Sequence, residues 1–206
     1  MRRIISLFSA ILWSLLALAQ TPEEIITRMD AEIKKRQQEG MVMTADSKVP
    51  ILGNVTVKTY VLGGKMRAET SMKGVKIITW SDGTTSWEYN SKKNEITINK
   101  VVASAADNDG DAGMFSGITE GFDVSIQKET DDAWYILCKK SKNNKDNDVP
   151  KTMDLVVQKN NYRPKSLSFK MTGISMTLRN IAFGVTEKQV TFNPADYPGA
   201  IIIDKR

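Results

Sequence analysis

The residue types that most often carry enzyme chemistry are nearly absent from this chain of 206 residues. It contains no histidine and a single cysteine, Cys138. Without histidine there is no Ser-His-Asp or Cys-His arrangement, and the commonest zinc ligand is missing. Cys138 lies in the strand-like run 133–138, where we expect it to pack as a small apolar side chain. We therefore predict that the protein is not an enzyme and uses no cofactor.

One acidic stretch has the composition of a metal-binding loop. Residues 107–111 read Asp-Asn-Asp-Gly-Asp, which resembles the start of a calcium loop. Such a loop needs glycine at its sixth position and glutamate at its twelfth, but Ala112 occupies the sixth and no glutamate occupies the twelfth. A solvated loop explains this stretch better, so we predict no metal site.

The segments that would position a binding surface look like strands with one apolar face. Residues 80–90 read Trp-Ser-Asp-Gly-Thr-Thr-Ser-Trp-Glu-Tyr-Asn, and Asp-Gly between strand-like arms predicts a hairpin in which both central residues have positive φ. Later strands alternate more clearly around a turn at Gly173. Such alternation is typical of an antiparallel sheet with one dry face and one wet face. The residues expected on a shared dry face, converging on one cavity, are Met66, Met72, Trp87, Tyr89, Phe169, Met171, Met176 and Leu178.

Methionine is frequent among these positions, and its flexible side chain suits surfaces that adapt to variable apolar ligands. For any single methionine, packing under a helix is the alternative explanation. We expect that helix at residues 22–39, because Thr21 can cap it, Pro22 suits its first position and Glu24 completes a capping box. One helix leaves part of a long sheet uncovered, so either another segment, such as residues 114–122, or a ligand covers the rest.

The N-terminus has the features of an export signal. A basic head, an apolar core and Ala17-Leu18-Ala19 predict a signal peptide over residues 1–19, followed by one domain over residues 20–206. A retained membrane anchor is the alternative. Loss of Arg2 and Arg3 lowers the net charge from +5 to 27 − 24 = +3. The cations are scattered among acids, so we predict no nucleic-acid surface.

Three segments together resemble a known family. Residues 64–69 (Gly-Lys-Met-Arg-Ala-Glu) and 77–90, with Ser-Asp-Gly-Thr-Thr-Ser-Trp-Glu-Tyr-Asn at their end, are similar to the periplasmic outer-membrane lipoprotein carriers of the LolA type. Residues 190–199 (Val-Thr-Phe-Asn-Pro-Ala-Asp-Tyr-Pro-Gly) resemble the segment before that family's last strand. The order, the spacing and the signal peptide agree over nearly the whole mature chain.

The resemblance implies a mainly β (α+β) fold. This is an incomplete antiparallel β-barrel, or half-barrel, with an N-terminal helix and a helical or loop lid over its concave apolar face. It further implies a soluble, monomeric periplasmic chaperone for lipoprotein transport that binds acyl chains in that apolar pocket. Acylated lipoproteins would come from an inner-membrane ABC-type release complex and go to an outer-membrane acceptor, with transient contact with membrane surfaces.

Two departures from the family leave alternatives open. Lys65 stands near the position of the family's lid-locking arginine and is our candidate for that role. The segment that matches the lid, residues 103–121, is rich in glycine and aspartate. A divergent half-barrel that binds lipid or senses envelope stress is therefore the second interpretation, and a secreted enzyme is the third and least supported.

Overall fold

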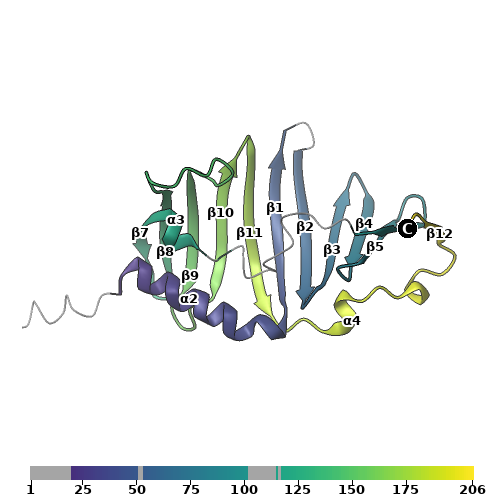
Figure 1. Cartoon of the computed structure of the whole chain (residues 1–206), viewed down its shortest axis with the longest axis horizontal. Helices are drawn as coiled ribbons and strands as arrows, with labels where there is room; N and C mark the ends of the chain where they lie inside the picture. The colour runs from purple at the N-terminus through teal and green to yellow at the C-terminus, as the bar shows by residue number, and fades with distance from the viewer. Residues whose placement is uncertain (1–19, 51–52, 102–114, 116) are drawn as a thin grey trace, which may run out of the picture.

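The structure is a computed structural model that describes residues 20–50, 53–101, 115 and 117–206 (Figure 1). The residue ranges of its strands are β1 (Met41–Val49), β2 (Gly53–Leu62), β3 (Lys65–Met72), β4 (Val75–Ser81), β5 (Thr85–Asn90), β6 (Glu95–Lys100), β7 (Phe122–Glu129), β8 (Ala133–Lys140), β9 (Thr152–Gln158), β10 (Pro164–Met171), β11 (Ile174–Phe183) and β12 (Ile201–Asp204). The helices are α2 (Pro22–Arg36), α3 (Ile118–Gly121) and α4 (Glu187–Val190), with short 3₁₀ turns η1 (Gln37–Glu39) and η3 (Pro194–Asp196). The signal peptide and most of the segment matched to the lid, including the acidic stretch 107–111, lie outside the described residues.

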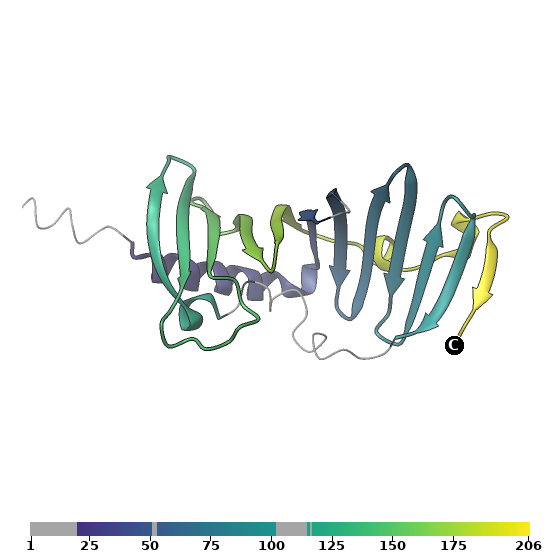
Figure 2. The same cartoon turned by 90° about the horizontal axis from the view of Figure 1, so that it is seen from above.

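All twelve strands belong to one sheet, in the order β12-β6-β5-β4-β3-β2-β1-β11-β10-β9-β8-β7. Neighbouring strands are antiparallel except β12 and β6, which run parallel. The sheet is open, with β12 and β7 at its edges, so the predicted half-barrel with an N-terminal helix is confirmed. Figure 2 shows α2 along one half of the sheet and the C-terminal segment along the other.

Helix α2 forms as the sequence predicts. The backbone N–H of Glu24 donates to the Thr21 hydroxyl at 3.2 Å, and the backbone N–H of Thr21 donates to the Glu24 carboxylate at 3.3 Å, which completes the capping box. Its apolar face buries Ile25, Ile26, Met29 and Ile33. None of the described helices is long and apolar enough to cross a membrane.

The chain turns sharply between η1 and β1 at Gly40, whose φ is +67°. A Cβ there would lie 2.5 Å from the carbonyl oxygen of Val61, so only glycine fits both the backbone angle and the space.

The main core lies between α2 and the strands β1 and β7–β11. Leu155, Leu167 and Leu178 are almost completely buried in it. Phe115 and Ile118 add a second cover, so this described part of the expected covering segment does close over the sheet. Cys138 is fully buried, and this burial raises its thiol pKa to about 12, as expected for a cysteine that packs as an apolar side chain.

The Asp-Gly hairpin is confirmed, but its turn is not the one predicted. Three residues separate β4 from β5, and of these only Gly83 has positive φ. The Asp82 carboxylate accepts hydrogen bonds from the backbone N–H groups of Thr84 and Thr85, at 2.9 and 2.7 Å. These bonds satisfy the turn without a left-handed aspartate, and they lower the pKa of Asp82 below its usual range.

Candidate functional site

The strands that α2 covers present one continuous apolar face. Leu167 of β10 pairs with Leu178 of β11, and Phe169 pairs with Met176, so the alternation predicted from the sequence is confirmed for this hairpin. Cross-strand partners project from the same face of a sheet. Because Leu167 and Leu178 are buried in the core under α2, Phe169 and Met176 belong to the same helix-covered face.

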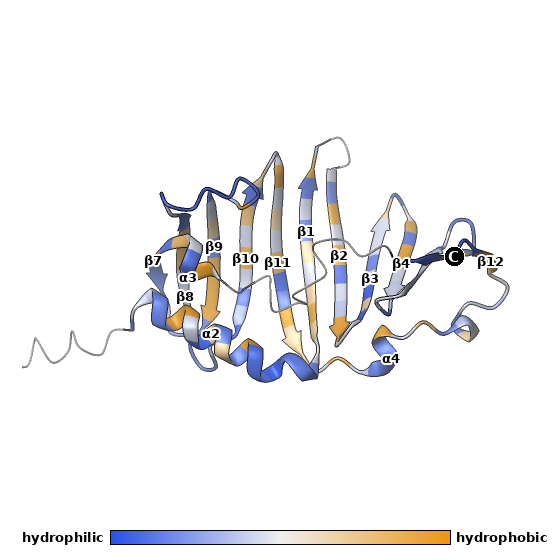
Figure 3. Cartoon of the chain, viewed as in Figure 1, coloured by the Kyte–Doolittle hydropathy of each residue, from blue (hydrophilic) through white to orange (hydrophobic). Residues whose placement is uncertain are grey.

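The apolar face continues beyond the reach of α2. Leu178 pairs with Ala45 of β1, Ala45 with Val57 of β2, Val57 with Thr70 of β3, and Thr70 with Ile77 of β4. Along this direction the apolar side chains become half-buried instead of buried, and those on β2 to β4 no longer belong to the core cluster. Figure 3 shows apolar segments recurring along β9–β11, β2 and β4. We call the half-buried part of this face the open strip: Val55, Val57, Val61, Met66, Met72 and Ile77.

Six of the eight predicted site residues lie on this helix-covered face. Met66 and Met72 belong to the open strip, and the register of β10 and β11 places the other four beside it. These four are Phe169, Met171, Met176 and Leu178. Their placement on one face agrees with the prediction, while their role in binding remains a prediction.

Trp87 and Tyr89 lie on the opposite face, so the expectation that all eight residues meet in one cavity is wrong. Trp87 pairs with Trp80, and Trp80 pairs with Arg67, the neighbour of Met66 that points the other way. Trp87 stacks on Phe192 with ring centroids 5.5 Å apart, and the rings of Tyr89 and Tyr197 lie 4.4 Å apart. The C-terminal segment therefore covers these two aromatic side chains.

The physical reason is that the buried apolar side chains change from one face of the sheet to the other at β4. Ile77 of this strand lies on the helix-covered face, whereas Ile78 and Trp80 lie on the opposite face and are buried there. On β5 the helix-covered face carries Ser86 and Glu88 instead of apolar residues. Alternation within one strand predicts which of its residues lie on the same side. It does not predict whether the apolar sides of two distant strands lie on the same face of the sheet.

Lys65, the candidate for the lid lock, forms an ion pair with Glu187 in α4. This contact lowers the pKa of Glu187 below its usual range. Helix α4 contacts β2 and β3 and belongs to the C-terminal segment, whereas α3, the described helix of the expected lid, packs on α2 and β7. Among the described residues, Lys65 therefore fastens the C-terminal segment to the sheet.

Arg67 is a residue that sequence reasoning missed. Its guanidinium lies over the rings of Tyr60 and Trp80, with its central carbon 5.7 and 5.5 Å from their centroids, and it pairs with Glu69 at 2.9 Å. In the sequence, Arg67 looks like a wet-face residue opposite Met66. The available signal was the aromatic content of the neighbouring strands, because arginine packs well on aromatic rings.

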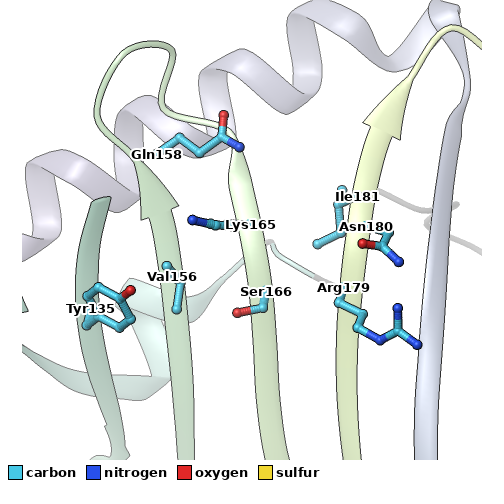
Figure 4. A pocket seen from close by; sticks show the side chains of 8 residues that line it. All are labelled: Tyr135, Val156, Gln158, Lys165, Ser166, Arg179, Asn180 and Ile181. Atoms are coloured by element: carbon cyan, nitrogen blue, oxygen red, sulfur yellow. The ribbon is translucent and has the colours of Figure 1, made fainter. Parts of the chain in front are cut away.

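A shallow pocket of about 440 Å³ lies on the face opposite α2, across β8–β11 (Figure 4). Its charged side chains already have partners: Lys165 pairs with Asp132 at 3.1 Å, and Arg179 pairs with Asp46. The described residues contain no group of side chains that could hold a metal ion. This pocket therefore offers no unpaired charge to a ligand, and the open strip is the better candidate site.

No family model matches the chain, and no curated protein matches it. Matching solved structures include an uncharacterized conserved protein from Thermus thermophilus, with 16% identity, 90% of this chain and 100% of that chain covered, and a TM-score of 0.47. A LolA superfamily protein from Nitrosomonas europaea matches with 12% identity, 86% and 100% coverage and a TM-score of 0.33. The MucA/MucB complex from Pseudomonas aeruginosa matches with 12% identity, 82% and 60% coverage and a TM-score of 0.46. The architecture described above, an open sheet with an N-terminal helix, agrees with the LolA-type resemblance of the sequence.

Proposed function

We propose that this protein is a periplasmic carrier that binds the acyl chains of lipoproteins on the open strip and shuttles them between membranes. The observation that carries this proposal is the extension of the helix-covered apolar face past α2. Val57, Met66 and Ile77 continue that face as half-buried side chains outside the core. The predicted signal peptide and the resemblance of residues 64–90 to lipoprotein carriers support the same assignment.

The chemistry of the strip suits an acyl chain better than a polar ligand. Each methylene removed from water contributes about 0.8 kcal/mol, so a long chain gains several kcal/mol even when it is only partly covered. The strip and its neighbours Phe169 and Met176 offer mainly apolar contact, and the half-buried polar groups among them are uncharged hydroxyls such as those of Thr59, Thr70 and Thr79. Such a surface accepts chains of different length and attached to different proteins, as a carrier requires. The proposed carrier role needs no chemical step, so the proposal assigns no enzyme activity to this protein.

A fluorescent fatty-acyl probe tests the binding step in solution. Val57→Asp places a charge on the open strip, whereas Lys58→Asp places the same residue one position away on the opposite face of β2. We expect Val57→Asp to weaken probe binding by about tenfold or more, because an unpaired carboxylate on an apolar surface is costly. Lys58→Asp should bind the probe as the natural protein does. Equal affinities in the two variants would contradict the proposed surface.

A transfer assay separates a carrier from a lipid sensor on the same fold. The protein is loaded with an acylated peptide, mixed with acceptor vesicles and then separated from them. A carrier should deliver the peptide to the vesicles, whereas a sensor should retain it or release it only with a protein partner. Mass spectrometry of the protein purified from its native envelope would identify the cargo, and a preparation free of lipid and lipoprotein would count against the carrier.

A further inference from the structure

The tip of the β10–β11 hairpin exposes two large apolar side chains side by side. Met171 and Ile174 are cross-strand partners and are 38% and 37% exposed. Between them Thr172 and Gly173 form a two-residue turn with φ angles of 46° and 82°. Among the described residues only four large apolar side chains are exposed, and these two share one tip. Hairpin tips in water usually carry polar residues, so this composition requires an explanation.

Exposed lysines flank this tip on the other face of the sheet. Lys170 directly precedes Met171 and pairs with Ser175, which in turn pairs with Lys48 of β1. Lys139, on β8, pairs with Thr152, which precedes Met153, the partner of Phe169, so Lys139 lies at the same end of the sheet. All three lysines are exposed, and none forms an ion pair with a described residue. Asp123 of β7 is the cross-strand partner of Lys139, so the tip combines an apolar pair with Lys48 and Lys170 and with a third lysine, Lys139, that lies opposite a carboxylate.

We propose that this tip docks the protein on an anionic lipid surface. An apolar pair that enters the boundary between headgroups and acyl chains, beside lysines that remain among the headgroups, is the arrangement by which proteins bind a membrane interface. The charge of the lysines is complementary to anionic lipid and acts within a Debye length of the membrane. Met171 and Ile174 enter the lipid, and Lys48, Lys139 and Lys170 contact the headgroups.

The position of the tip connects docking to the proposed function, on which its biological purpose rests. From Met171 and Ile174, the same face of the hairpin continues to Phe169 and Met176 and then to the core under α2. Gly173 lies close to Pro50, so the end of β1 and the hairpin tip approach the membrane together. Met176 also pairs with Ser47 of β1, and Ser47 pairs with Val55 of the open strip, so an acyl chain that leaves the lipid at the tip has a short, mainly apolar route to the proposed binding surface.

Vesicle co-sedimentation of the full chain, without cargo, tests the docking directly. The probes are vesicles of phosphatidylcholine alone and of phosphatidylcholine mixed with phosphatidylglycerol. We expect the natural protein to bind the mixed vesicles, and binding to fall as salt is raised, because the lysine contacts are screened. No binding to the mixed vesicles would overturn the proposal.

Two variants separate the apolar and electrostatic contributions. Met171→Ser with Ile174→Ser should lower vesicle binding about tenfold and keep its salt dependence. Lys48→Gln with Lys139→Gln and Lys170→Gln should lower binding to the level seen with neutral vesicles. Matched controls carry the same changes at exposed positions elsewhere: Ile201→Ser with Ile202→Ser, and Lys92→Gln, Lys93→Gln and Lys205→Gln. Equal losses in variants and controls would overturn the tip as the docking site.

Acyl-probe binding in solution, measured on the same variants, keeps the two proposals distinct. Loss of vesicle binding with intact probe binding supports the docking tip and leaves the proposed function untouched. Vesicle binding by a protein that fails to bind the acyl probe supports the docking tip and contradicts the proposed function. Thermal unfolding midpoints of all variants confirm that the changes leave the fold intact.

Discussion

The ring of Trp87 in β5 stacks on the ring of Phe192 in the C-terminal segment, with planes 18° apart. The ring of Trp80 packs edge-on against two rings of the same segment, with its centroid 5.3 Å from that of Phe192 and 5.6 Å from that of Tyr197. The sheet is thus covered twice, by α2 on one face of one half and by the C-terminal segment on the other face of the other half. In this arrangement the aromatic cluster under the C-terminal segment and the open strip proposed as the binding surface lie on opposite faces of the sheet.

Phe192→Ala tests this separation. Loss of a half-buried aromatic side chain that contacts three rings should lower the free energy of unfolding by about 2–4 kcal/mol. Denaturant unfolding measures the loss, and Thr191→Ala, at an exposed neighbouring position, is the control. Acyl-probe binding should be unchanged in the variant, because Phe192 lies on the face opposite the open strip. A fall in probe affinity at full folding would show that the two faces are linked.

Much of this fold follows from local patterns in the sequence. Thr21 and Glu24 specify the start of α2, Gly173 specifies the β10–β11 turn, and the alternation around Phe169 specifies its dry face. The sequence could not predict whether apolar residues of distant strands lie on the same face of the sheet, because this depends on the pairing register of every strand between them. The cover over Trp87 was missed for another reason: the segment 191–200 has no periodicity, and its aromatic residues find their place only through long-range packing.

Gly40→Ala should be strongly destabilising, and Gly63→Ala is its matched control. Both glycines have positive φ, +67° and +59°, so both substitutions introduce backbone strain. At Gly40 ψ is 164°, a combination that essentially only glycine adopts, so we expect the larger strain there. Only at Gly40 does the added Cβ also meet backbone, 2.5 Å from the carbonyl oxygen of Val61, whereas nothing lies within 4 Å at Gly63. We expect the unfolding free energy to fall further for Gly40→Ala, by at least about 1 kcal/mol more. Equal losses would show that the chain relaxes around position 40.

Cys138 should be inert in the folded protein. Its pKa of about 12 leaves the thiol protonated at neutral pH, and the side chain is fully buried. Because the thiolate is the reactive form, a thiol reagent at pH 8 should label Cys138 only when the protein unfolds. The labelling rate measured against denaturant concentration should follow the unfolding transition. Rapid labelling in the absence of denaturant would mean that the β8 region opens locally.

The same thiol makes stability depend on pH in the alkaline range. The folded state keeps its proton up to a pKa of about 12, whereas the unfolded thiol loses its proton near the ordinary value of 9.0. Between these values the folded state holds more protons, so its stability is fully present below pH 9 and falls as the pH rises toward 12. Cys138→Ala should remove this part of the decline. Identical alkaline profiles for the two proteins would show that other groups dominate.

Lys65→Ala distinguishes a fastener of the C-terminal segment from a lock on a lipid-binding lid. Lys65 pairs with Glu187, whose side chain is largely exposed while that of Lys65 is partly exposed, so the loss of unfolding free energy should be small. Because this pair lies on the face opposite the open strip, acyl-probe affinity and transfer to acceptor vesicles should equal those of the natural protein. Lys65→Arg should behave in the same way, since arginine can keep the pair with Glu187. Tighter probe binding by Lys65→Ala, with weaker binding and faster transfer by Lys65→Arg, would instead identify Lys65 as the lid lock that the family resemblance suggests.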